Sequence, residues 1–176
     1  LVIAGDLHGF DVGASAHPTV YGSMPGTLIP SPGTMVRASV LWLTAEQITA
    51  LTWTEISYAL GRLGDIRFDA DQPGAPTVGA ALAYVSRLGA HRVDGELVAL
   101  AAVPAARRTA PAHTQAELLD HVARLTLGPD AAARDLVRRL MEDFGAASAI
   151  IAPRLRETAE LFAAPGWTAW ADDRPR

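Results

Sequence analysis

The chain of 176 residues carries 19 acidic and 15 basic side chains, a formal net charge of −4, and it contains no cysteine, lysine or asparagine. These counts exclude disulfides, thiolate and Schiff-base chemistry and a lysine-dependent phosphate loop, and the absence of a basic stretch argues against a nucleic-acid partner. With 49% hydrophobic and 19% charged residues, the composition is that of a globular domain large enough to bury a core.

The chain opens with an apolar strand at residues 1–4 and a second strand segment at residues 10–12, separated by Gly5-Asp6-Leu7-His8-Gly9. The run VIAGDLHG resembles the first metal-binding motif of calcineurin-like metallophosphatases, which supplies an Asp and a His. Those enzymes also use an Asn-containing motif, and this chain has no asparagine. We therefore favour a turn in which Asp6 bonds the backbone, and we predict no metal and no cofactor.

A long loop is predicted over residues 14–32, because Pro25, Pro30 and Pro32 forbid a helix and interrupt a central strand. Its small residues allow backbone amides to approach an anionic ligand closely. The alternative is a plain surface connection, and the sequence does not separate the two. His17 lies in this loop and either orients a ligand or makes an ordinary polar contact.

The next elements are a strand, a helix that begins with a capping box, and a second strand, at residues 35–43, 44–54 and 58–63. Glu55 ends the helix and is flanked in sequence by Trp53, Ile56 and Tyr58. Apolar neighbours exclude water from a carboxylate and favour its protonated form, which is how a Glu carries protons near neutral pH. Glu55 is therefore the main candidate for a catalytic residue.

The rest of the chain changes from strands to helices. Residues 65–76 are expected to form an exposed loop, and residues 78–88 and 96–103 to pair in a hairpin through Asp94-Gly95. Three helices follow, at about residues 114–128, 131–144 and 146–162, the first with a capping box from Thr114 to Glu117. Strands followed by helices predict an α+β fold.

Several further side chains have predicted structural roles only. Arg107 and Arg108 lie in a segment rich in Pro and Ala and are expected to be solvated. Trp167 and Trp170 are expected to cover edges of the core, because exposed indoles are costly. His91, His113 and His121 show no metal-ligand spacing.

The motifs in residues 21–63 occur in one order: Pro-Gly-Thr-Leu, Pro-Ser-Pro-Gly, the strand ending Leu-Trp-Leu-Thr, the helix AEQITAL, then Glu55 and Tyr58. In this order they resemble the γ-glutamylcyclotransferase-like superfamily, which includes plant AIG2-type proteins and a domain of allophanate hydrolases. The resemblance implies a small mixed β-barrel domain over residues 1–105. A helical C-terminal extension, residues 106–176, would then pack on that domain.

The resemblance also implies a reaction and a site. Glu55 would act as general base and acid while a γ-glutamyl amine closes on itself to give 5-oxoproline, without a cofactor. The substrate, a small molecule derived from an amino acid, would be bound by Tyr21, Gly22, Ser23 and Tyr58. Tyr21-Gly22-Ser23 matches the family's opening loop in letters but directly precedes the Pro-Gly segment, so we expect the family's first strand and its loop to precede Leu1.

Two other hypotheses remain open at this point. One is a non-catalytic module on the same fold that binds a small molecule or a protein, and the other is a metallophosphatase remnant built on Asp6 and His8. No apolar run approaches the roughly 20 residues that span a bilayer, so we expect no membrane partner and a cytoplasmic location. The sequence carries no information on the oligomeric state.

Overall fold

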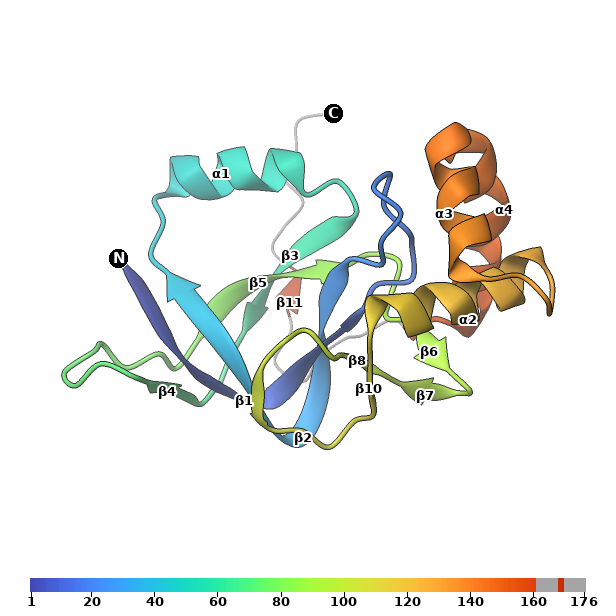
Figure 1. Cartoon of the computed structure of the whole chain (residues 1–176). Coiled ribbons are helices and arrows are strands. Elements are labelled where there is room, and N and C mark those ends of the chain that lie inside the picture. The colour runs from blue at the N-terminus through green and yellow to red at the C-terminus, as the bar shows by residue number, and fades with distance from the viewer. Residues whose placement is uncertain (161–167, 170–176) are drawn as a thin grey trace.

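The computed structural model describes residues 1–160 and the backbone of residues 168–169; Trp167 and Trp170 lie outside the described residues. Strands occupy the first part of the chain and helices the second, so the predicted α+β order is confirmed (Figure 1). The strands are β1 (Val2–Ala14), β2 (Gly26–Leu41), β3 (Tyr58–Leu63), β4 (Phe68–Ala70), β5 (Ala81–Ser86), β6 (Arg92–Val93), β7 (Glu96–Leu97), β8 (Ala99–Leu100), β9 (Ala105–Arg107), β10 (Ala112–His113) and β11 (Thr168–Ala169). The helices are α1 (Ala45–Thr54), α2 (Gln115–Leu127), α3 (Ala133–Glu142) and α4 (Phe144–Thr158).

The long antiparallel pair β1–β2 is the centre of the fold, and it corrects two predictions. The first strand runs through the segment predicted as a turn around Asp6, and the second begins at Gly26, inside the predicted loop. The register jumps from His8↔Met35 to Phe10↔Pro30, so residues 31–34 bulge opposite Gly9. A bulge tolerates prolines because its residues leave the hydrogen-bond ladder.

The strands of the described residues form three sheets. The largest has the order β10-β8-β1-β2-β9, with β4 also paired to β1, and it is mixed because β10 and β8 are parallel. The others are β11-β3-β5 and the small hairpin β6-β7. Across the described residues they form no closed barrel, so the expected small β-barrel is corrected. The two larger sheets are linked by a hydrogen bond of 2.9 Å that the Ser86 amide donates to Thr27 Oγ1.

Two predictions in the middle of the chain are wrong in their pairing. The expected exposed loop at residues 65–76 contains β4, which pairs with β1 at Gly5–Leu7. The strand β5 pairs with β3 and does not form the predicted hairpin with residues 96–103. The Asp94-Gly95 turn does form, with positive φ at both residues, but it closes only the short hairpin β6–β7.

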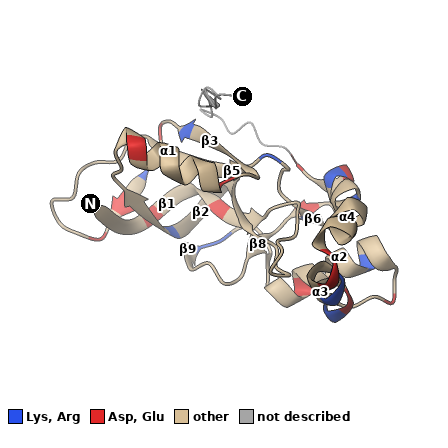
Figure 2. Ribbon diagram, turned by 90° about the horizontal axis from the view of Figure 1, so that it is seen from above, with Lys and Arg blue, Asp and Glu red and all other residues tan. Residues whose placement is uncertain are grey.

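Local side-chain chemistry starts the helices as predicted. Thr44 with Gln47 and Thr114 with Glu117 form complete capping boxes at α1 and α2. Asp143 caps α4, which contains Pro153. None of the helices within residues 1–160 is long and apolar enough to cross a bilayer. Acidic and basic residues are interspersed along the ribbon (Figure 2).

Two clusters of buried apolar side chains form the core. The first joins the inner faces of α2, α3 and α4 to residues from the strand half, including Ala14, Met24 and Val98. The second, which includes Leu7, Val36 and Leu63, lies between the two larger sheets. Val12 packs against both clusters. The helices therefore share one core with strand residues.

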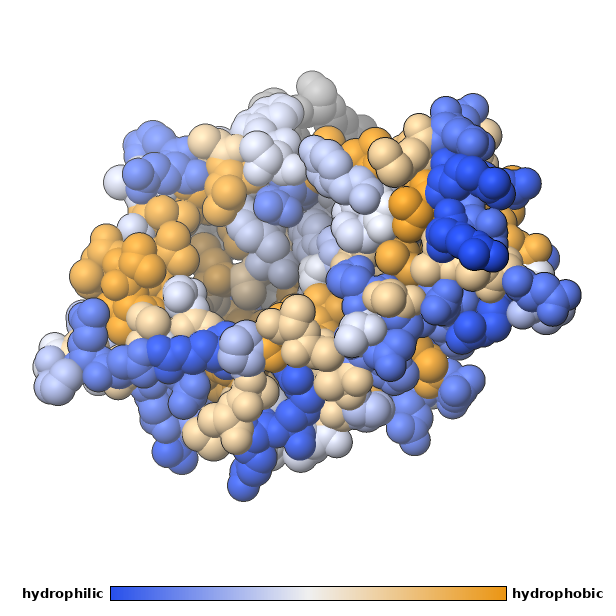
Figure 3. Space-filling view, in the orientation of Figure 1, coloured by the Kyte–Doolittle hydropathy of each residue, from blue (hydrophilic) through white to orange (hydrophobic). Residues whose placement is uncertain are grey.

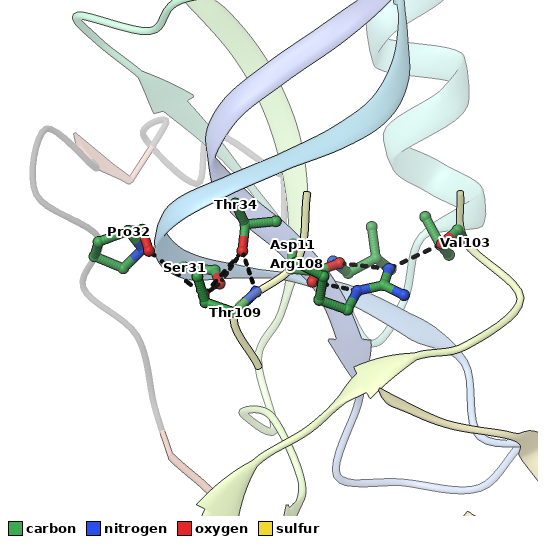
Figure 4. A network of polar contacts seen from close by, with 8 residues as sticks. Asp11, Ser31, Pro32, Thr34, Val103, Arg108 and Thr109 are labelled. Atoms are coloured by element: carbon green, nitrogen blue, oxygen red, sulfur yellow. Dashed lines mark hydrogen bonds and ion pairs between the residues drawn. The ribbon is translucent and has the colours of Figure 1, made fainter. Parts of the chain in front are cut away.

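Arg107 is exposed as predicted, whereas Arg108 corrects the prediction that both arginines are solvated. The Arg108 guanidinium holds the wholly buried carboxylate of Asp11 at two points, Nε to Oδ2 at 2.7 Å and Nη2 to Oδ1 at 3.0 Å, and also donates to the Val103 carbonyl (Figure 4). Beside it, Thr109 joins the hydroxyls of Ser31 and Thr34. Residues 103–109 are thus fastened along the β1–β2 pair.

Candidate functional site

Glu55 is the C-terminal cap of α1, and the turn that follows leads directly into β3. Its backbone amide donates to the Thr52 carbonyl, and its carbonyl accepts from the Tyr58 amide at 3.1 Å. The side chain is half-buried, and its carboxylate has no hydrogen bond or ion pair with any residue in the described part of the chain. Trp53 and Ile56 are 62% and 78% exposed, so they do not enclose Glu55 as its sequence neighbours suggested.

Tyr58 lies next to Glu55 and points back toward the start of β2. Its hydroxyl donates to the Gly26 carbonyl at 2.7 Å. Burial raises the pKa of Tyr58 to about 12; the nearby charge of Glu55 adds to the rise, and contact with Ser15 opposes it. The phenol is therefore a neutral hydrogen-bond donor at physiological pH. The structure brings these two predicted site residues together.

A buried polar network continues from Tyr58 into the junction of the sheets. Ser15, at the end of β1, donates to Ser86 Oγ at 2.6 Å and lies 2.7 Å from His17 Nδ1. Because the one hydroxyl proton of Ser15 goes to Ser86, the His17 contact requires Nδ1–H to donate, which leaves Nε2 as an acceptor. The rings of His17 and Tyr58 pack edge to face at 6.1 Å. Burial lowers the pKa of His17, so the ring is neutral.

Sequence reasoning missed most of this network. Ser15, Thr27 and Ser86 are buried polar residues from three different strand ends, and only the fold brings them together. The one available signal was Ser15-Ala16-His17 directly after an apolar strand. Such a pattern is frequent in ordinary loops and carries little weight alone.

The other predicted binding residues lie in a tight turn. The amide of Gly22 donates to the Thr19 carbonyl at 3.0 Å, and the hydroxyls of Thr19 and Ser23 are 2.8 Å apart. Tyr21 is 85% exposed, and the backbone of Gly22 packs closely on Val137 of α3. No hydrogen bond within residues 1–160 joins Tyr21, Gly22 or Ser23 to Glu55 or Tyr58.

The backbone amides of this loop are already used inside the protein. Those of Ser15 and Ala16 donate to Pro25 and Gly89, and the Met24 amide donates to Gln115 Oε1. The amides of Gly22 and Ser23 bond Thr19. The expectation that these amides hold an anion or oxyanion is therefore not supported for these positions.

A cavity of about 580 Å³ lies beneath α1, between the two larger sheets. The space-filling view is hollowed near its centre, below α1, and apolar side chains gather beside it around the N-terminus and the end of β2 (Figure 3). Its walls include Leu28, Ile48, Leu51, Leu60 and Tyr84. This volume lies in the range of small-molecule sites.

The residues of the metallophosphatase hypothesis lie on β1 on either side of Leu7, which lines this cavity, but neither of them lines it. His8 Nε2 is 2.7 Å from Asp69 Oδ2, and Asp6 lies 3.6 Å from the Arg37 guanidinium, which also pairs with Asp71. Within the described part of the chain, no three His, Asp or Glu residues are arranged to hold a metal ion. The contacts of Asp6 and His8 are those of a surface ion-pair network.

A pair of histidines, His91 and His121, lies where the strands meet α2. The ring of His91 is wholly buried and packs at 5.2 Å from that of His121. Neither ring nitrogen of His91 has a hydrogen-bond partner among the described residues. Burial, with a smaller contribution from His121, lowers the pKa of His91 to about 4.

No protein-family model, curated protein or solved structure matches this chain.

Proposed function

We propose that this chain is a γ-glutamylcyclotransferase-like protein that converts a γ-glutamyl amine into 5-oxoproline, with Glu55 as general acid and base. The observation that carries the proposal is the state of Glu55. Glu55 is half-buried, and its carboxylate has no hydrogen bond or ion pair within residues 1–160. The residue lies beside Tyr58 at the end of the helix that covers the cavity. A carboxylate in that position is free to accept a substrate proton.

The reaction needs only one carboxylate, because both reacting groups belong to one molecule. Glu55 takes a proton from the α-amine of the substrate, and the amine nitrogen then attacks the γ-carbonyl carbon to close a five-membered ring. The bond from that carbon to the outer amine breaks, and Glu55 returns the proton to the departing nitrogen. The products are 5-oxoproline and a free amine, and no water is consumed.

Tyr58 and His17 complete the proposed site. The Tyr58 hydroxyl is protonated at working pH, and by turning from the Gly26 carbonyl to the substrate it supplies a donor for the developing oxyanion. His17 is held by Ser15 through Nδ1, so Nε2 is the atom left to accept a hydrogen bond from the substrate ammonium. These roles replace those expected for the loop amides, which are bonded elsewhere.

The test is release of 5-oxoproline from a panel of γ-glutamyl amines by the wild type and by Glu55→Gln. We expect turnover in the wild type and a loss of at least about 100-fold in the variant, the scale of a lost general acid–base group. Glu157→Gln, at an exposed position of α4, is the matched control and should keep full activity. Equal turnover by wild type and Glu55→Gln would rule out the proposed role.

A second candidate is a non-catalytic module that binds a small molecule or a protein. It is favoured by the cavity itself, whose described lining contains no charged residue. This candidate predicts ligand binding with no 5-oxoproline released from any γ-glutamyl amine. Turnover that depends on Glu55 would exclude it.

A further inference from the structure

The apolar stripe of α1 lies over an unfilled space. No residue of this ten-residue helix is buried, and Leu51 is 41% exposed although it lines the cavity. A helix this short is marginal in water by itself and normally gains its stability from a packed apolar face. Ile48 and Leu51 therefore have apolar surface available for contact with a bound molecule.

The same stripe leads to the proposed catalytic residue. Positions 48, 51 and 55 are three and four residues apart, so Ile48, Leu51 and Glu55 lie along one side of α1. On the opposite wall, Leu60 and Tyr58 are two residues apart on β3 and therefore share a face of that strand. The side of α1 and the face of β3 that line the cavity with Leu51 and Leu60 thus continue to Glu55 and Tyr58, which lie beyond its lining.

The composition of the cavity lining also indicates which ligand groups the cavity disfavours. None of the described residues that line it is charged. A hydrogen bond of 2.7 Å between the hydroxyls of Thr52 and Tyr84 lies at its edge. A carboxylate brought into such a place would lose its hydration without gaining a cationic partner. The lining therefore disfavours an amino acid as the departing amine.

We infer that the substrates are γ-glutamyl derivatives of uncharged apolar amines, whose aliphatic or aromatic group occupies the cavity beneath α1. This inference rests on the proposed function, because it assigns a position to the outer half of the same substrate. The γ-glutamyl half lies at Glu55 and Tyr58. The departing amine carries the apolar group and leaves with the proton that Glu55 returns.

The test compares γ-glutamyl-methylamide, -butylamide and -benzylamide with γ-glutamylglycine in the release of 5-oxoproline. Each buried methylene should raise kcat/KM about threefold to fourfold. The benzylamide should exceed γ-glutamylglycine by at least about 100-fold, since the glycine carboxylate has no partner in the cavity. Equal kcat/KM across the series would overturn the inference and leave the proposed function standing.

A cavity-filling variant tests whether the cavity causes the preference for apolar amines. Ala83 lines the cavity, and Ala83→Leu should lower the benzylamide-to-methylamide ratio of kcat/KM by about tenfold, because the added atoms occupy the space of the ring. Ala50→Leu, on the exposed side of α1, adds the same group outside the cavity and should leave the ratio unchanged. An unchanged ratio in a folded Ala83→Leu protein would overturn the assignment of the cavity.

A binding measurement separates the two possible failures. If no amide is turned over, the proposed function is wrong, and with it the substrate class. N-benzylacetamide, which lacks the reacting amine, then probes the cavity alone through tryptophan fluorescence, since Trp42 lines it. Saturable binding that is lost in Ala83→Leu would support an apolar-ligand site without the reaction, and no binding would overturn that as well.

Discussion

Two nitrogen atoms of the Arg108 guanidinium donate hydrogen bonds to the carboxylate of Asp11, which is wholly buried. The two residues are 97 positions apart in the sequence. The pair fixes the segment that leads from the sheets to the helices against the middle of β1. Two hydrogen bonds between opposite charges compensate for the cost of removing both charges from water. Either charge left alone in the interior would be costly.

The first prediction concerns this pair. Arg108→Ala should lower the free energy of unfolding by about 3–5 kcal/mol, because it leaves the buried charge of Asp11 without a partner. Arg138→Ala removes an exposed arginine that pairs with Asp135 at 3.4 Å and should cost no more than about 1 kcal/mol. Urea unfolding of both variants checks this, and similar losses would contradict it.

The second prediction concerns the unpartnered ring of His91. The folded-state pKa of His91 is about 4 against an ordinary value of 6.5, so between these pH values the unfolded chain binds a proton that the folded chain does not. Stability should therefore be fully present above about pH 6.5 and fall by about 3 kcal/mol as the pH is lowered to about 4.

His91→Leu is the comparison for that experiment. Leucine needs no hydrogen bond, so the variant should be about 1 kcal/mol more stable at pH 7. It should also lose part of the decrease in stability between pH 6.5 and 4, while His17 and His121, whose pKa values are also lowered by burial, supply the remainder. Urea unfolding at several pH values measures both effects. Identical pH profiles for the two proteins would show that His91 does not titrate in this way.

The third prediction compares two glycines with nearly the same backbone conformation. Gly9 and Gly89 have φ of 80° and 83°, but a Cβ atom at Gly89 would lie 2.6 Å from the Glu160 carbonyl oxygen, whereas at Gly9 it would meet open space. Gly9→Ala should cost about 1–2 kcal/mol from backbone strain alone. Gly89→Ala should cost about 1–3 kcal/mol more because the backbone of Glu160 must move. Thermal or urea unfolding that ranks them equally would contradict the close approach.

The fourth prediction separates the structural and chemical roles of Tyr58. Tyr58→Phe removes the hydrogen bond to the Gly26 carbonyl and should lower stability by about 1 kcal/mol. If the hydroxyl also serves the proposed reaction, kcat should fall by about tenfold or more while KM changes little. Thr52→Val, which removes the partner of the Tyr84 hydroxyl, is a control that should leave kcat unaffected. A loss of stability with unchanged kcat would restrict Tyr58 to a structural role.

The sequence predicted best those features that depend on residues close together in the chain. The capping boxes at Thr44 and Thr114 form as expected, since all the groups involved lie within four consecutive residues. The nearness of Glu55 and Tyr58 follows in the same way from the short connection at residues 55–57 between helix and strand.

The features that the sequence did not predict depend on long-range pairing. The bulge that admits Pro32 into β2 exists only because β1 lies opposite, and the bond between Ser15 and Ser86 joins residues 71 positions apart. The charge of Arg108 looked solvated because its partner is distant in sequence. Hydrophobic periodicity carries no information on such partners.

The packing of Val12 against both clusters of the core has a consequence for how the molecule unfolds. One strand carries side chains into the packing of the helices and into the packing between the sheets, so neither region can lose its order without disturbing the other. The described residues should behave as a single cooperative unit, in which loss of helix and loss of side-chain packing follow one transition curve.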